Sequence, residues 1–199
     1  MRKPMDILCF GRSPDLVPWE GRPFSPGVET GPRPTDKRDN HERAVGMEPP
    51  GPPVADGPHR RAARALLAFD VFPPRLLTGV VRRAPVEPGD AVGVLYHFLP
   101  GMKLFFASRV LERFDEEREG KWRTGFSYRT LAGHPETGEE TFCVEKDLAT
   151  GKVVVALRSW SRPGIWLSRW LYPLTRRWQL QAGRLALDHL EAIARSLPA

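Results

Sequence analysis

Side chains that could act in catalysis or binding are densest between residues 134 and 140. His134 and the carboxylates of Glu136, Glu139 and Glu140 fall within this short stretch. Such a set could coordinate a metal ion, or it could supply a general acid and a general base. The proline and glycine between them also suit a tight hairpin loop, with the histidine capping backbone carbonyls and the glutamates paired with arginines. We favour the structural loop, because charge-rich turns are common and metal-binding loops are rare. An interpretation between the loop and the metal site is recognition of a ligand at the rim of a cavity, for which His134 and Glu140 are the candidates.

Arg158 is a second candidate for binding. It lies in a predicted strand from Val153 to Trp160, on the face opposite the apolar residues that alternate with it. A buried guanidinium would need an anionic ligand or a carboxylate partner, and Glu145 or Glu140 on a neighbouring strand could provide the carboxylate. We favour a surface ion pair, because arginine is seldom fully buried.

Aromatic residues are frequent on the predicted strands and on the last predicted helix. Together they could line a pocket for an apolar or aromatic ligand, although ordinary core packing accounts for any one of them. With the polar candidates they give a predicted ligand-binding set, which is Phe98, Phe106, Trp122, Phe126, Tyr128, His134, Glu136, Glu140, Arg158, Trp160 and Trp170.

Several motifs with well-defined chemistry are absent from the sequence. There is no glycine-rich phosphate loop followed by Lys-Ser/Thr, no GxSxG elbow and no HExxH motif. Cys9 and Cys143 lie far apart and lack the spacing of metal ligands. We therefore assign no catalytic residue, and we expect no metal and no cofactor.

A run of strands must position the candidate residues. From Gly79 to Ser161 apolar side chains alternate with polar ones, which is typical of antiparallel strands with one buried face. On this pattern Phe114 shares a face with Val110. The expected hairpin connections lie at residues 99–101, 116–121, 134–138 and 149–151.

Helical segments flank these strands. A helix is predicted to begin near Pro58 and to end before the two prolines at 73–74, and a short helical turn at 75–78 follows. Residues 165 to about 196 carry apolar side chains near a 3.6-residue period, which predicts a long amphipathic helix. Pro173 removes one helical hydrogen bond, so we expect a kink or a break there.

The chain divides into two parts. Prolines at 4, 14, 18, 23, 26, 32 and 34 disfavour a regular helix or a central strand within residues 1–40. Large apolar residues such as Trp19 and Phe24 lie in the same segment, so we expect an extended arm that packs along the domain surface. Residues 41–199 form the single predicted domain, and its first strand is expected from His41 to Met47.

The order of these elements predicts an α+β fold. A curved antiparallel sheet of about six or seven strands wraps around the long C-terminal helix, because a single antiparallel sheet needs its apolar face covered. A cavity remains between sheet and helix wherever side chains do not fill the space.

This order of elements resembles the helix-grip fold of the START and birch-pollen-allergen superfamily. Two motifs, GFSYRTLAGHPE at residues 125–136 and GEETFCVE at residues 138–145, resemble the signature of the domain-of-unknown-function family numbered 1990. The segment APVEPG at 84–89 and the pattern from Ser161 to Gln179 are similar to that family as well. The resemblance covers roughly residues 40–190 and implies the helix-grip fold, but the family carries no established activity.

Composition narrows the classes of partner. The formal net charge is +6 and 24 of the 30 basic residues are arginine, but no run of five or more basic residues occurs. Nucleic-acid binding is therefore not favoured, because clustering on one face, rather than net charge, marks such a site. No apolar run reaches 18 residues, and the apolar stretch near the N-terminus is too short for a signal peptide. We expect no membrane span and a cytoplasmic location, and the oligomeric state stays open.

Three functions are compatible with these features. We favour a non-enzymatic binding module that holds a small hydrophobic or amphipathic molecule between sheet and helix. The first alternative is an enzyme of the cyclase, hydrolase or lyase type that uses the same cavity with His134 and a glutamate. The second alternative is a protein that binds another protein or a nucleic acid through its arginine-rich surface.

Overall fold

A curved antiparallel sheet of eight strands dominates the computed structural model, which describes residues 8–10, 14–74, 77–99, 102–164 and 172–196. The strands follow the order β2-β8-β7-β6-β5-β4-β3, and the short β1 pairs with β5. The sheet exceeds the expected six or seven strands because β1 comes from the proline-rich arm. The strands are β1 (Leu8–Phe10), β2 (Lys37–Met47), β3 (Leu77–Val80), β4 (Ala91–Leu99), β5 (Met102–Arg118), β6 (Lys121–Thr130), β7 (Glu136–Asp147) and β8 (Lys152–Pro163).

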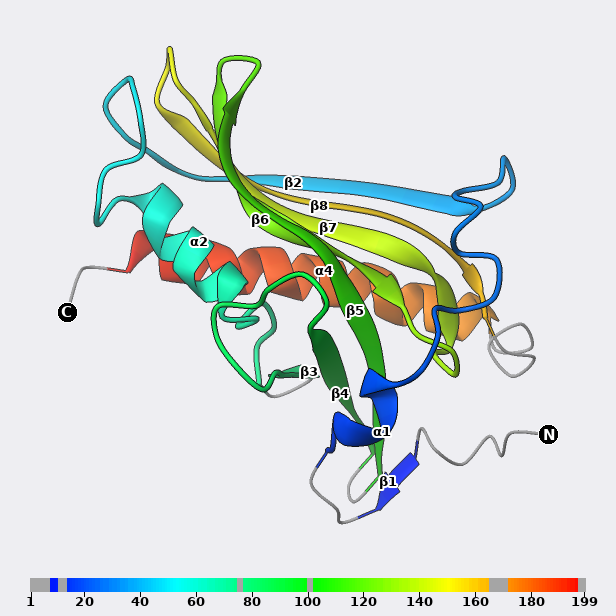
Figure 1. Ribbon diagram of the computed structural model, residues 1–199. Helices are drawn as coiled ribbons and strands as arrows, with labels where there is room; N and C mark the ends of the chain where they lie inside the picture. Colours follow the sequence, from blue (N-terminus) through cyan, green and yellow to red (C-terminus); the bar gives the residue numbers. More distant parts are fainter. Residues whose placement is uncertain (1–7, 11–13, 75–76, 100–101, 165–171, 197–199) are drawn as a thin grey trace.

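The C-terminal helix α4 (Tyr172–Arg195) lies along the concave face of the sheet, and Figure 1 shows the strands curving around it. It packs against α2 (Pro58–Leu67), β2 and β8, and its buried face carries Ala186, Leu187 and Leu190. This arrangement confirms the predicted α+β helix-grip fold. None of the helices in the described residues is both long and apolar enough to cross a membrane.

The described part of α4 runs without interruption through Pro173. Pro173 is the second residue of the helix, where a backbone N–H has no intrahelical acceptor, so the missing donor breaks no bond. The predicted helical stretch at 165–171 lies outside the described residues.

Helix α2 begins at Pro58, as predicted, and a buried ion pair fixes its first turn. Lys146 Nζ on β7 lies 2.9 Å from Glu48 Oε2, and both side chains are almost fully buried. Glu48 Oε1 accepts a hydrogen bond of 2.8 Å from the backbone N–H of His59, in the first turn of α2. The pKa of Glu48 is below its ordinary value: burial opposes this shift, but hydrogen bonds from His59 and Lys146 outweigh it.

The helical turn predicted at 75–78 is wrong for Leu77 and Thr78, which belong to β3. They pair with Tyr96 and Leu95 of β4, and this long-range pairing overrides the local preference. The remaining two residues of that turn lie outside the described part of the chain.

An irregularity in β5 changes which of its side chains face α4. The register between β5 and β6 shifts between Val110 and Glu112. A bulge inserts one residue, and every later side chain then points to the other face. Phe114 therefore leaves the face of Val110 and packs under the guanidinium of Arg123, 5.1 Å from its ring centre, so the predicted shared face is wrong.

The segment before β2 covers the convex face of the sheet. Trp19 is 2% exposed and meets the ring of Phe105 edge-on at 6.2 Å. The backbone N–H of Ser25 donates to the carbonyl of Thr130 at 2.9 Å. This segment includes a one-turn helix, α1 (Val17–Glu20), with a proline in its first turn. Strand β2 begins at Lys37, so the expected strand start at His41 is four residues late.

Candidate ligand-binding site

A cavity of about 250 Å³ lies between the concave face of the sheet and α4. Its walls are apolar side chains from β3, β4, β5 and β8 and from the loop after α2. Ala182 and Gly183 of α4 line the side opposite the sheet, and the cavity is partly open to solvent. The apolar and aromatic lining residues include Phe72, Leu77, Val94, Tyr96, Leu104, Phe106 and Leu157.

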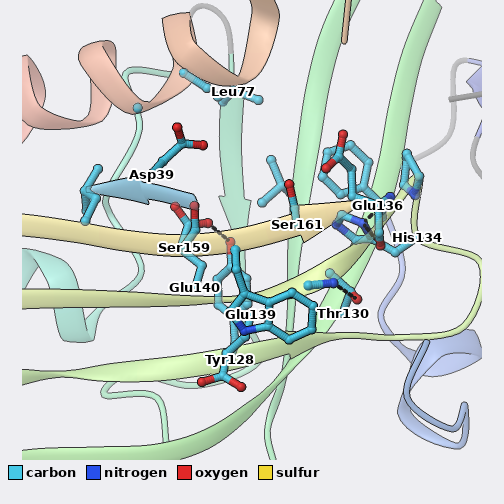
Figure 2. Close-up of a pocket in the computed structure, with 18 of the residues that line it drawn as sticks. Asp39, Leu77, Tyr128, Thr130, His134, Glu136, Glu139, Glu140, Ser159 and Ser161 are labelled. Carbon is cyan, nitrogen blue, oxygen red and sulfur yellow. Dashed lines mark hydrogen bonds between the residues drawn. The ribbon is translucent and has the colours of Figure 1, made fainter. Parts of the chain in front are cut away.

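A row of polar side chains crosses the sheet at one side of this cavity. Asp39 of β2 pairs with Ser159 of β8, Ser159 pairs with Glu140 of β7, and Glu140 pairs with Tyr128 of β6. Paired residues in neighbouring strands share a face, so all four side chains leave the sheet toward α4. Figure 2 shows Tyr128 and Glu140 meeting, and the phenol Oη donates a hydrogen bond of 2.7 Å to Glu140 Oε2.

Glu140 has an unusual acidity in this setting. Burial raises its pKa from 4.5 to about 7, and the negative charges of Asp39 and Glu136 raise it further, while the bond from Tyr128 opposes the shift. The pKa of Tyr128 lies well above its ordinary value because the phenol is buried and next to Glu140. Glu140 therefore exchanges protons near neutral pH while Tyr128 stays protonated.

His134 lines the cavity from the connection before β7. Its Nδ1 lies 2.9 Å from the carbonyl oxygen and 3.0 Å from the amide nitrogen of Glu136, so this backbone can hold either ring tautomer. Burial lowers the pKa of His134 to about 4, so the ring is neutral at pH 7. The ring also packs edge-on against Phe106, with 4.6 Å between centroids.

Six residues of the predicted ligand-binding set border this cavity: Phe106, Tyr128, His134, Glu136, Glu140 and Trp160. Trp160 and its neighbour Glu139 belong to the boundary, yet the register directs both side chains to the convex face. There Glu139 bonds Arg129 Nε at 2.7 Å, and Arg162 lies over the Trp160 ring at 5.3 Å.

Three other residues of that set, Phe126, Trp122 and Arg158, lie away from the cavity. Phe126 is fully buried and stacks on Phe142 with 5.4 Å between centroids. Trp122 lies at the far end of β6, where its indole N–H donates to Asp115 Oδ1 at 2.6 Å. The two-residue periodicity along β6 correctly predicts that both side chains lie on the concave face. It does not predict how far along the strand each residue lies from the cavity.

Arg158 lies on the convex face, where it forms ion pairs with Glu145 at 2.8 Å and Glu42 at 3.0 Å. The surface ion pair that the sequence favoured is therefore present, and Arg158 does not reach the cavity. The side chains of Phe98 and Trp170 lie outside the described residues.

The stretch from His134 to Glu140 is not the hairpin loop that its prolines and charges suggested. Strand β7 begins at Glu136, and Gly138 sits so close to β8 that a Cβ there would lie 2.2 Å from the carbonyl oxygen of Trp160. The turn lies earlier, where Gly133 adopts a φ of 100°. Glu136 and Glu140 consequently share the face that meets α4, while Glu139 does not.

Sequence reasoning missed the contribution of β2 to the site. Asp39 and His41 both line the cavity, as does Ser159 on the paired strand. Asp39 was assigned to the arm because prolines precede it. The signal that could have identified it is the two-residue spacing of Asp39, His41, Arg43 and Val45, which continues the pattern of the predicted strand.

Among the described residues, no three or more histidine, cysteine, aspartate or glutamate side chains converge in a way that could hold a metal ion. The polar groups at the cavity can instead hydrogen-bond to a ligand or transfer a proton. The buried phenol and carboxyl of Tyr128 and Glu140 are the pair best suited to both.

Comparisons with known proteins agree with this description. A UPF0548 protein from Dictyostelium discoideum is 34% identical over 127 residues, or 60% of this chain and 58% of the relative. A UPF0548 protein from Deinococcus radiodurans is 38% identical over 104 residues, or 49% of this chain and 50% of the relative. The matches thus span between half and three fifths of the length of these two curated relatives.

Among solved structures, a hypothetical protein from Helicobacter pylori has a TM-score of 0.52 and 14% identity, and covers 92% of this chain and 95% of the other. This likeness concerns the fold alone. Residues 27–188 match the model of the family described as a domain of unknown function, DUF1990. Because this match includes both strands of the Tyr128–Glu140 pair and most of α4, the chain belongs to the DUF1990 family.

Proposed function

We propose that this chain is a non-enzymatic binding protein that holds one small, largely apolar molecule between the sheet and α4. The observation that carries the proposal is the cavity of about 250 Å³. This space is concave, partly open to solvent and lined mostly by apolar side chains, which is typical of sites that bind small molecules. An occupant that supplies its own apolar surface accounts for such a space.

The composition of the walls supports an amphipathic occupant. Val94, Leu104 and Phe106 offer apolar surface, and the Tyr128–Glu140 pair offers a proton donor and an acceptor at one side. Ligand sites commonly combine apolar walls with a few polar groups that fix the orientation of the ligand.

The arginine-rich surface offers less support for a nucleic-acid partner. Many of the arginines in the described part of the chain are engaged by neighbouring carboxylates, which reduces the positive potential available to a phosphate backbone. The engaged arginines include Arg43, Arg60, Arg83, Arg113, Arg129, Arg158 and Arg162.

Binding of a neutral aromatic probe tests the proposal. We expect 1-naphthylmethanol to bind one site with a Kd on the order of 10–100 µM, followed by its fluorescence and by calorimetry. Replacing Gly183 of α4 by phenylalanine should abolish this binding, because Gly183 lines the cavity and the added ring would occupy space beside His41, which a Cβ at this position already contacts at 3.5 Å.

The matched control is Gln181→Phe, which adds the same side chain to the exposed side of α4 and should leave binding intact. Circular dichroism of both variants checks that the fold is retained. Absence of saturable binding to the wild-type protein, or equal binding by Gly183→Phe and the wild type, would overturn the proposal.

A second candidate is acid–base catalysis in the same cavity, and the acidity of Glu140 favours it. A carboxyl group with a pKa of about 7 can both donate and accept a proton at neutral pH. His134 suits this role less, since its pKa of about 4 keeps the ring neutral. Mass spectrometry of a metabolite extract incubated with the protein tests this candidate: the wild type should convert a component that Glu140→Gln leaves unchanged. An extract that the wild type does not alter contradicts catalysis.

A further inference from the structure

We propose that the cavity selects amphipathic amines, whose apolar body fills the space beside α4 and whose ammonium group pairs with Glu140. This inference rests on the proposed binding function and names the chemical class of the ligand. It starts from the position of Glu140, a carboxylate on the concave face that lines the cavity.

Glu140 lies inside the cavity without a cationic partner. Its hydrogen bond comes from the neutral phenol of Tyr128 at 2.7 Å, and it forms no ion pair among the described residues. No lysine or arginine lines the cavity in that part of the chain. A half-buried carboxylate beside apolar walls is stabilised by a positive partner, so the position beside Glu140 is suited to a ligand cation.

Two arginines near Glu140 in the described part of the chain, Arg129 and Arg43, form ion pairs with other carboxylates. Arg129, on the strand beside Glu140, bonds Glu139 at 2.7 Å on the convex face. Arg43 of β2, further along the concave face, pairs with Asp188 and Glu191 of α4. Neither guanidinium is available to Glu140 without breaking an existing ion pair.

The charges around Glu140 disfavour an anionic ligand. Asp39 of β2 and Glu136 of β7 both add negative potential at the carboxyl group, as the direction of its pKa shift shows. A ligand carboxylate would meet the same repulsion, whereas an ammonium group would be attracted. Among the described residues, the other titratable groups that line the cavity are Tyr128, Tyr96, His41, His134 and Glu139, and Glu139 is paired with Arg129 on the convex face.

The aromatic walls also suit a cation. Phe106 and Tyr128 line the cavity with Glu140, and an ammonium group that lies over an aromatic face gains a further electrostatic attraction. The apolar walls contributed by Leu104 and Leu157 would hold the body of the same molecule.

Three probes with one aromatic body and different head groups test the inference. At pH 8, 1-naphthylmethylamine should bind about tenfold more tightly than 1-naphthylmethanol, and 1-naphthoate should bind about tenfold more weakly than the alcohol. If the alcohol binds and the amine shows no preference, this inference falls while the proposed binding function stands. If none of the three binds, the binding function falls as well.

Glu140→Gln keeps the shape of the side chain and removes its charge. The variant should keep the wild-type affinity for the alcohol. Its affinity for the amine should fall to within about threefold of its affinity for the alcohol, because the charge-assisted bond is lost. The matched control is Glu139→Gln, one residue away and directed to the opposite face, which should retain the amine preference of the wild type. A preference that survives Glu140→Gln would overturn the inference.

The pH dependence gives an independent measurement. An alkylammonium stays protonated between pH 6 and 8, as lysine does, whereas Glu140 ionises with a pKa of about 7. Affinity for the amine should therefore rise severalfold from pH 6 to pH 8, while affinity for the alcohol stays flat. A flat profile for the amine would contradict the pairing with Glu140.

Discussion

Strand β7 carries two ionisable side chains on the same face, the fully buried Lys146 near its end and the half-buried Glu140 near its start. Lys146 meets Glu48 at 2.9 Å under the first turn of α2, and the pKa of Glu48 is lowered. Glu140 meets the phenol of Tyr128 beside an unfilled space, and its pKa rises to about 7. The same strand thus has a closed end with a paired charge and an open end whose carboxyl group has no ion-pair partner in the part of the chain that the structure describes.

Under the proposed function, one end of the sheet stabilises the fold and the other end binds the ligand. At the α2 end, the charges satisfy each other and the backbone N–H of His59, so no position remains for a ligand. At the cavity end, the sheet leaves a partly open space, and Glu140 beside it forms no ion pair among the described residues. A ligand can supply what that end lacks, which is the physical basis of the proposed function.

Breaking the closed end should have the largest effect. Lys146→Met leaves Glu48 buried without its cation, so we expect the free energy of unfolding to fall by about 3–5 kcal/mol in urea titrations at pH 7. Lys121→Met removes a half-exposed partner of Glu145 and should cost less than about 1 kcal/mol. Equal effects of the two substitutions would contradict the distinction between the ends.

Neutralising the open end should stabilise the protein, with a defined pH dependence. The pKa of Glu140 in the folded state lies above its ordinary 4.5, so wild-type stability decreases as pH rises from about 4.5 to about 7. The Glu140→Gln variant does not lose stability in this way, because glutamine does not ionise. At pH 8 it should be more stable than the wild type by up to about 2–3 kcal/mol, and at pH 4 nearly equal to it. Urea titrations at the two pH values measure the difference, and a variant destabilised at pH 8 would refute the assignment.

Filling a small part of the open end should have the smallest effect. Gly183 lies inside α4, where alanine is favoured over glycine, and a Cβ there meets His41 at an ordinary contact distance of 3.5 Å. Gly183→Ala should raise the free energy of unfolding by about 0.5–1 kcal/mol, measured by thermal denaturation. A loss of stability would mean that the space beside His41 is narrower than described.

The sequence was sufficient to predict the sheet, its concave face and its covering helix. Alternation along β6 correctly placed Tyr128 toward α4, and the resemblance of residues 125–145 pointed to the correct family. The periodicity of a strand indicates which face each side chain occupies, and it can be read from the local sequence without knowledge of tertiary contacts.

The features that were missed depend on pairing between distant segments. Asp39 joins the site because β2 pairs with β8, more than one hundred residues later in the chain. Phe114 changes face because of one bulge in β5, which leaves no clear mark in the alternation. Glu136 and Gly138 look like loop residues locally, and their pairing with β8 makes them strand.

The N-terminal segment covers part of the convex face, so removing it should affect the stability and solubility of a shortened fragment. A fragment cut at residue 27, where the family match begins, would lose Trp19 from the ring of Phe105 and Ser25 from Thr130. An apolar surface patch would then be exposed to solvent, and proteins with such patches tend to self-associate. Thr130 Oγ1 also accepts a bond from the Gly138 N–H at the cavity wall, so trimming would loosen the neighbourhood of Glu140 from the outside.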